Sequence, residues 1–171
     1  LNGLRSLPVQ YPILSEEDSH VVYENRKDWQ YFWLVDPLDG TKEFINKNGE
    51  FTVNIGLIEN NVPIFGVVYT PVIDCMYWGG TEHGAFKIDK SGSELSLSVT
   101  YDFDDPIILA GSRSHPGGKM QAFISQFNDP EVIPMGSSLK ICSVADGTVH
   151  LYPRLGPTME WDTAAAHAIL K

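Results

Sequence analysis

The sequence has 171 residues, a length typical of one domain that can bury a hydrophobic core of its own. Its formal net charge of −10, from 12 basic and 22 acidic residues, excludes a generic binder of nucleic-acid polymers, which needs a basic surface. No apolar run reaches the length of a membrane span, and the N-terminus lacks the pattern of a signal peptide. We therefore expect a cytoplasmic protein with two reduced cysteines and no integral membrane segment, which leaves peripheral membrane association and the oligomeric state open.

In the first half of the chain, apolar runs separated by turn residues predict a series of strands. Five segments have this pattern: 31–36, 51–60, 62–72, 75–80 and 84–89. Asn60 and Asn61 predict a β-hairpin between the second and third segments, and the later two extend it into an antiparallel meander. Residues 40–47 predict a short helix, with Asp39 near its N-cap position.

The second half mixes strand and helix patterns. Strands are expected at 95–102, 107–112 and 148–154, and helices at 117–127, 137–147 and 158–171. The helix at 137–147 is expected to have a serine cap at its start and to end at Gly147. Runs of strands interrupted by helices predict a layered α+β fold rather than regular βαβ alternation. No repeat or linker is visible, so residues 1–171 are interpreted as a single catalytic unit.

The segment "WLVDPLDGTKEF" (33–44) places two aspartates at the end of an apolar strand pattern. Magnesium prefers hard oxygen ligands in octahedral geometry. Because Pro37 restricts the backbone between Asp36 and Asp39, both carboxylates and the Leu38 carbonyl can face one pocket. In that arrangement Asp36 bridges two ions at the separation of about 4 Å that is typical of two-metal phosphoryl chemistry.

The residues that follow suit a phosphate group. Gly40 allows close approach, the amides of Gly40 and Thr41 favour an anion, and the Thr41 hydroxyl can orient an attacking water. The alternative is a plain turn in which the aspartates only cap a helix. Taken singly, Glu16 in "LSEED" reads as a solvated charge, and Asp162 in "EWDTAA" as a helix-dipole partner.

Three further segments could contact the rest of a phosphorylated substrate. "GSRSH" (111–115) ends in His115, and "GSSLK" (136–140) contributes Ser137, Ser138 and Lys140. "YPR" (152–154) ends a predicted strand with Arg154, whose guanidinium suits bidentate phosphate contact. The plainer alternatives are serines that cap a helix and an arginine that is solvated.

The combination "LSEE", "DPLDGTKEF" and "GPTMEWDTAAAHAIL" resembles the inositol monophosphatase superfamily of magnesium-dependent, lithium-sensitive phosphatases. Lys42 and Glu43, the "GSSLK" segment and "YPRLGPTMEWDTAA" resemble its 3′(2′),5′-bisphosphate nucleotidase branch more than the inositol phosphatases. The resemblance implies a layered αβαβα sandwich, incomplete at both ends in this chain. It also implies further helices before "LSEE", carrying an aspartate that hydrogen-bonds the threonine, and further layers after the last helix. Together with the absence of an initial Met, this leads us to expect a fragment of a longer polypeptide.

Residue by residue, the resemblance implies a site with two or three Mg²⁺ ions. Glu16, Asp36 and the Leu38 carbonyl would bind one ion, and Asp36, Asp39 and Asp162 a second. Glu16, Asp39 and Thr41 would be catalytic, with Thr41 placing the water beside Glu16. The predicted substrate contacts are Glu16, Leu38, Asp39, Gly40, Thr41, His115, Ser137, Ser138, Lys140, Arg154 and Asp162.

The resulting expectation is a phosphatase that converts adenosine 3′,5′-bisphosphate to AMP by a metal-activated water. An inositol monophosphatase or another sugar-phosphate phosphatase is the alternative within the same chemistry. From another class, the chain could be an inactive module that binds nucleotide or metal, although its full carboxylate set argues against decay. A calcium-binding acidic domain is disfavoured because no loop has EF-hand-like ligand spacing.

Overall fold

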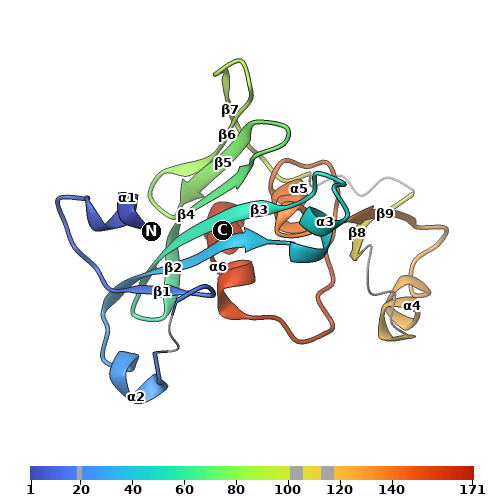
Figure 1. The fold of residues 1–171 in the computed structure, drawn as a ribbon. Helices are drawn as coiled ribbons and strands as arrows, with labels where there is room; N and C mark the ends of the chain where they lie inside the picture. The colour runs from blue at the N-terminus through green and yellow to red at the C-terminus, as the bar shows by residue number, and fades with distance from the viewer. Residues whose placement is uncertain (19–20, 101–105, 113–117) are drawn as a thin grey trace.

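The computed structural model describes residues 1–18, 21–100, 106–112 and 118–171. Seven strands form one sheet in which each strand pairs with the next in sequence (Figure 1). β1 runs parallel to β2, and every later pairing is antiparallel. The strands are Ile13–Ser15 (β1), Tyr31–Asp39 (β2), Thr52–Glu59 (β3), Val62–Thr70 (β4), Cys75–Gly80 (β5), Gly84–Ile88 (β6) and Glu94–Ser96 (β7). The predicted hairpin and meander are confirmed.

A second, smaller sheet lies at the other end of the molecule (Figure 1). It consists of β8 (Ile108–Ser112) and β9 (Glu131–Met135), which pair in parallel and are separated in sequence by α4 (Gly118–Ile124). Leu151 adds a single parallel bridge to Leu109. The remaining helices are α1 (Asn2–Arg5), α2 (Tyr23–Arg26), α3 (Thr41–Ile45), α5 (Leu139–Ala145) and α6 (Glu160–Leu170).

Helix α6 packs closely against one face of the large sheet. Its alanines are buried there, and two strand glycines allow the close approach. A Cβ atom on Gly66 would lie 2.0 Å from the Ala165 carbonyl oxygen, and one on Gly56 would lie 3.2 Å from the Ala165 nitrogen. Since real Cβ contacts are never as short as the first distance, Gly66 is required by packing rather than by backbone conformation.

Two hydrophobic clusters fill the space between this face and the helices. One contains Val68 and Tyr77 from the sheet with Cys142 of α5 and Ala165 of α6. The other joins β1, β2 and β3 to the start of α6, where Trp161 packs. Both cysteines are buried and reduced, as expected. Among the described helices, none combines the length and the apolar character needed to cross a membrane.

The α+β prediction is confirmed, but some local predictions are wrong. The strand expected at 148–154 is reduced to the Leu151 bridge, because Pro153 lacks the amide that a longer ladder would need. The strand expected from residue 95 ends at Ser96. Asp39 is the last residue of β2, and the N-cap of α3 is Gly40, at φ +89°. Strand β9 was not predicted.

Candidate active site

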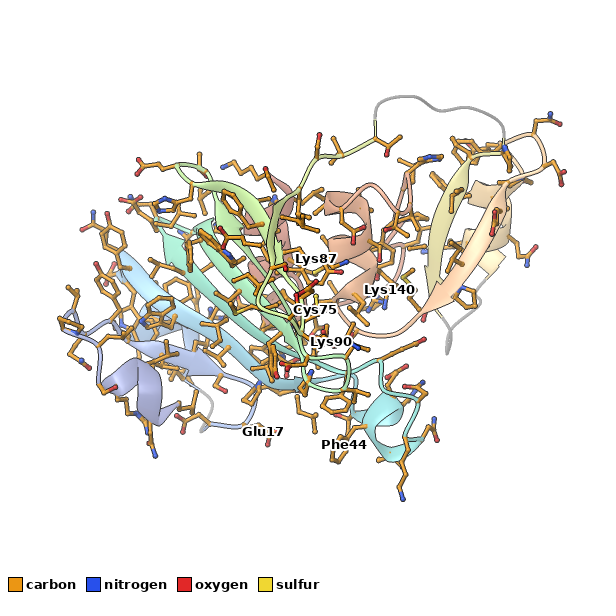
Figure 2. All side chains as sticks on the ribbon, turned by 90° about the horizontal axis from the view of Figure 1, so that it is seen from above. Glu17, Phe44, Cys75, Lys87, Lys90 and Lys140 are labelled. Carbon is orange, nitrogen blue, oxygen red and sulfur yellow. The ribbon has the colours of Figure 1, made fainter. Side chains whose placement is uncertain are left out.

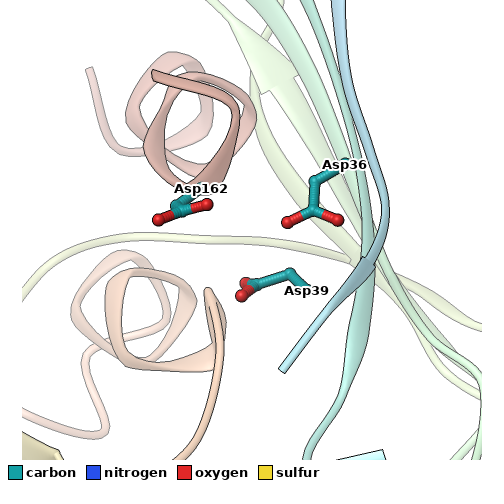
Figure 3. Close-up of side chains that lie close together, drawn as sticks. All are labelled: Asp36, Asp39 and Asp162. Carbon is teal, nitrogen blue, oxygen red and sulfur yellow. The ribbon is translucent and has the colours of Figure 1, made fainter. Parts of the chain in front are cut away.

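Three carboxylates meet where β2 ends and α6 begins (Figure 3). One oxygen each from Asp36, Asp39 and Asp162 lies within 4.8 Å of the other two. Asp36 is almost fully buried, with 1% of its surface exposed, and the other two are half-buried. Within the described residues, none of the salt bridges involves any of the three. Such a concentration of uncompensated carboxylate oxygens favours a bound cation.

An irregularity in β2 brings the two strand aspartates onto one face. Asp36 pairs with Asn54, and Asp39 pairs with Thr52, so three steps along β2 match two steps along β3. In a regular strand, residues three apart point to opposite faces, and one extra residue reverses this. Pro37 lies within the irregularity, and the Leu38 amide donates to Asp36 Oδ1 at 2.9 Å.

The surroundings of Asp36 disfavour its charge. Burial raises its pKa to about 8, and the negative charges of Asp39 and Glu16 add to the effect. The hydrogen bond from the Leu38 amide lowers the pKa but does not cancel the rise. A cation at this position would compete with the proton and hold Asp36 ionised at neutral pH.

Asp39 is held through one oxygen. Its Oδ2 accepts hydrogen bonds from the Ser138 amide at 2.6 Å and the Ser138 hydroxyl at 2.8 Å. Asn54 Nδ2 at 3.2 Å and Thr52 Oγ1 at 3.3 Å approach the same oxygen. The sequence reasoning missed Thr52 and Asn54. The available signal was their alternation as buried polar residues in the otherwise apolar strand "TVNIGLI".

Asp162 also caps the helix that carries it. Its Oδ2 accepts hydrogen bonds from the Met159 amide at 3.0 Å and the Thr158 hydroxyl at 2.8 Å. Asp162 therefore stabilises the start of α6 and also lies beside Asp36 and Asp39.

Glu16 and Thr41 lie at the edges of the carboxylate cluster. The Glu16 amide donates to the Val35 carbonyl at 3.2 Å, and its side-chain charge is close enough to add to the rise in the pKa of Asp36 that burial causes. Thr41 is exposed at the start of α3. A Cβ on Gly40 would lie 3.3 Å from both Glu43 Oε2 and Ser137 Cβ, so the turn leaves little room for a larger residue.

Basic side chains share a small pocket of about 60 Å³ with Asp39 and Asp162. Lys140, labelled in Figure 2, extends from α5 and donates to the Ser137 carbonyl at 2.6 Å. Burial lowers its pKa, and the negative charges of Asp39 and Glu43 oppose that shift. Arg154 is exposed and donates to the Pro157 carbonyl at 2.6 Å. The lining is Asp39, Ser137, Ser138, Lys140, Ile141, Tyr152, Arg154, Thr158, Asp162 and Thr163.

A second, larger pocket of about 340 Å³ shares two lining residues, Tyr152 and Arg154, with the first. Its other walls come from α4 and from the segment around Gly156. Met120 and Pro157 give it apolar surface beside the charged groups of Lys119 and Arg154. The two pockets therefore offer adjoining places for a charged group and a larger, flatter one.

Most predicted site residues are brought together by the fold. Asp36, Asp39 and Asp162 form the cluster, Glu16 is beside Asp36, and the predicted serines, Lys140 and Arg154 line the same pocket as Asp39. A serine, Ser138, occupies the N-cap position of α5 as predicted, but this residue is buried and its side chain makes no hydrogen bond that caps the helix. His115 lies outside the described residues.

The chain is similar to known phosphatases along nearly its whole length. Residues 2–171 match the sequence model of a protein family that is described as "Inositol monophosphatase family". A 3′(2′),5′-bisphosphate nucleotidase CysQ from Salmonella typhimurium is 50% identical over 99% of this chain and 67% of the relative. CysQ from Escherichia coli K12 is 48% identical with the same coverage. The chain thus spans about two thirds of the length of these relatives.

Solved structures agree with the fold. CysQ from Bacteroides thetaiotaomicron, a bacterial member of the inositol monophosphatase family, has a TM-score of 0.86 and 42% identity, covering 97% of this chain and 66% of that one. An inositol monophosphatase from Anabaena has a TM-score of 0.76 and 30% identity, covering 97% and 65%. The chain belongs to the inositol monophosphatase family, within its 3′(2′),5′-bisphosphate nucleotidase branch.

Proposed function

We propose that this chain carries the catalytic unit of a Mg²⁺-dependent phosphatase that hydrolyses the 3′-phosphate of adenosine 3′,5′-bisphosphate, giving AMP and phosphate. The observation that carries the proposal is one pocket lined by Asp39 and Asp162 of the carboxylate cluster together with Lys140 and Arg154. The carboxylates suit metal ions, and the basic groups suit the phosphate of a nucleotide. The names of the nucleotidase relatives support this substrate over an inositol phosphate.

The donor set fits hard divalent cations. Glu16, Asp36 and the Leu38 carbonyl would hold one ion, and Asp36, Asp39 and Asp162 a second, in a site of two or three ions. These are oxygen donors only, which magnesium prefers over softer metals. When bound, the ions supply a nucleophilic water at neutral pH and positive charge for the phosphate oxygens.

The reacting groups would be positioned by residues around the turn from β2 to α3. The Thr41 hydroxyl orients the attacking water. Glu16, which is exposed beside Asp36, accepts a hydrogen bond from this water. The Gly40 and Thr41 amides bind the phosphate that is hydrolysed. Catalysis then rests on positioning and charge stabilisation, as in other phosphoryl transfers.

The second phosphate and the nucleoside of the substrate would be bound by other residues of the two pockets. The 5′-phosphate would be bound by Ser137, Lys140 and Arg154 in the smaller pocket. The larger pocket, which Tyr152 and Arg154 also line, would accommodate the nucleoside. His115 and Ser138 are the remaining substrate contacts predicted from the sequence. His115 lies outside the described residues, and Ser138 is buried, with its hydroxyl hydrogen-bonded to Asn54.

The test measures phosphate release by the full-length polypeptide from adenosine 3′,5′-bisphosphate, inositol 1-phosphate and fructose 1,6-bisphosphate, with Mg²⁺ and with added Li⁺. We expect preference for the nucleotide, a requirement for Mg²⁺ and inhibition by Li⁺. Arg154→Ala should raise KM for the nucleotide more than for inositol phosphate, while Lys90→Ala, an exposed residue away from the pockets, changes neither. Preference for inositol phosphate would overturn the substrate assignment, and no hydrolysis of any substrate would overturn the enzyme.

A further inference from the structure

The geometry points to Asn54 as a positioning residue, which acts with Ser138 and Thr52 to fix the oxygen that Asp39 presents to a metal ion. This inference rests on the proposed metal site and adds residues that lie behind it. None of the three is a predicted metal ligand. They come from β3 and from the N-cap of α5, and all three are buried, with at most 3% of their surface exposed.

The first step concerns the two oxygens of Asp39. Oδ2 accepts hydrogen bonds from the Ser138 amide at 2.6 Å and from Asn54 Nδ2 at 3.2 Å, and the hydroxyl oxygens of Ser138 and Thr52 lie 2.8 and 3.3 Å away. A carboxylate oxygen offers about two lone-pair directions, so this oxygen is filled by protein donors. Oδ1 is left as the oxygen for a cation, which makes Asp39 a ligand through one defined atom.

The second step concerns the orientation of the Asn54 amide. Its Nδ2 donates to Asp39 Oδ2 at 3.2 Å and to Ser138 Oγ at 2.8 Å. Its Oδ1 accepts from Thr52 Oγ1 at 3.0 Å. Both amide hydrogens and the carbonyl are therefore used, and a flipped amide would place its NH₂ group against the Thr52 hydroxyl and its carbonyl against a carboxylate. Only one orientation satisfies the network.

The third step concerns the Ser138 hydroxyl. It accepts from Asn54, which leaves its hydrogen for the Asp162 carbonyl at 2.7 Å or for Asp39 Oδ2 at 2.8 Å. One hydroxyl thus connects the strand end that carries Asp39 to the helix that carries Asp162. Because these two residues are predicted ligands of the same ion, the network sets their separation. We therefore assign Ser138 a positioning role, which leaves Ser137 to face the substrate.

The fold alone does not require polar side chains at positions 52, 54 and 138. The same face of the sheet is filled by apolar side chains such as Leu34, Ile58 and Val68. Buried hydroxyls and amides are destabilising unless they are fully hydrogen-bonded, and an apolar group of similar shape can replace them with little loss. In known metal sites, removal of the groups that orient a ligand typically weakens metal affinity by about 10- to 100-fold.

The test measures Mn²⁺ binding to the chain without nucleotide, by electron paramagnetic resonance of the free ion, together with thermal unfolding in EDTA. Asn54→Leu keeps the branched shape of the side chain and removes all three of its hydrogen bonds, so we expect at least about tenfold weaker binding. Ser138→Ala should behave similarly. The midpoint temperature of thermal unfolding in EDTA should change little, because apolar packing replaces the lost polar contacts.

A matched pair of isosteric variants separates positioning from general loss of a buried hydroxyl. Thr52 and Thr70 are both 0% exposed on the same sheet face, but the Thr70 hydroxyl donates to the Cys75 carbonyl, away from the cluster. Thr52→Val should weaken Mn²⁺ binding about threefold or more. Thr70→Val should leave it unchanged, and Thr52→Ser should restore it by keeping the hydroxyl.

The outcomes distinguish this inference from the proposed function. Wild-type Mn²⁺ affinity in Asn54→Leu and Ser138→Ala would overturn the positioning role, even in an active nucleotidase. Weakened Mn²⁺ binding in a chain that hydrolyses none of the substrates would support the role and overturn the function instead. If Asn54→Leu does not fold, equal affinities of Thr52→Val and Thr70→Val would overturn the inference, and unequal ones would support it.

Discussion

Two partly buried groups of polar residues on the same side of the large sheet differ in how their charge is balanced. Near β5 and α5, the Asp146 carboxylate accepts a hydrogen bond from the Tyr77 hydroxyl at 3.2 Å and pairs with Lys87 Nζ at 3.2 Å. At the end of β2, Asp36, Asp39 and Asp162 lie together without a salt bridge among the described residues. The first group is complete within the chain, whereas the second has a surplus of negative charge.

This difference separates a structural cluster from a candidate functional one. A buried carboxylate is tolerated when a cation and hydrogen-bond donors surround it, as at Asp146. Without a cation, proximity and burial raise the carboxylate pKa, as they do at Asp36. The unbalanced cluster therefore favours binding of something positive, and the comparison can be tested from either side.

The largest effect is expected for Asp39→Asn. An asparagine would turn its carbonyl toward the donors from Ser138, Asn54 and Thr52, which leaves an NH₂ group facing the metal position. We expect turnover to fall on the order of a thousandfold or more, with an unchanged circular dichroism spectrum. A collapsed spectrum would show instead that Asp39 is needed for the fold, as in the plain turn alternative.

Substitutions in the group around Asp146, whose charge is balanced by Lys87, should lower stability rather than activity. Lys87→Met removes the cation beside Asp146, which is 10% exposed in its side chain, while Lys87 itself is 31% exposed. Because the pair is partly screened by solvent, we expect a loss of roughly 1–2 kcal/mol in the free energy of unfolding. Urea titration measures this loss, and the Mg²⁺ concentration for half-maximal activity should stay the same. A shift in that concentration would contradict the distinction between the two clusters.

The unbalanced cluster predicts a pH dependence of the metal-free protein. The pKa of Asp36 is about 8 in the folded chain and near its ordinary value of 3.8 in the unfolded chain. Between these values the folded state binds one proton more, so its stability decreases as pH rises from about 4 through 8. Unfolding in EDTA at several pH values measures the slope, and Asp36→Asn should flatten it. An equal slope in the variant would assign the effect to other groups.

The smallest effect is expected where Asp162 combines capping with its place in the cluster. Thr158→Val removes an exposed hydrogen bond to Asp162 Oδ2 and leaves the Met159 amide in place. We expect Mn²⁺ affinity to fall only about twofold, less than for variants of the buried network. A loss as large as that for Asn54→Leu would mean that burial does not decide which contacts orient the ligands.

Local sequence patterns were sufficient for the meander and for the last helix. Apolar runs bounded by turn residues predicted β3 and β4, and the alanine-rich end predicted α6, because each of these elements buries apolar side chains on one face. The pattern at 148–154 was misleading, since Pro153 stops a ladder that the apolar residues would otherwise favour. Strand β9 was missed because its pairing partner lies more than twenty residues earlier.

The groups available to the site follow directly from the amino-acid sequence: two aspartates around a proline, then Gly40 and Thr41, with Glu16 and Asp162 far away in the chain. These features, with their resemblance to a known family, predicted the carboxylate set before any geometry was known. Chemical type and local order are properties of the chain alone, because side-chain chemistry does not depend on the fold.

How these groups are held depends on contacts between distant parts of the chain. The irregular register between β2 and β3 places Asp36 and Asp39 on the same face, and local sequence does not specify that register. The contact between Asp39 and Ser138 joins residues 99 positions apart. It assigns the Ser138 hydroxyl to a network with Asn54 that no spacing rule reveals. Such long-range hydrogen bonds depend on how the sheet packs against α5 and α6, so they exist only once the chain has folded.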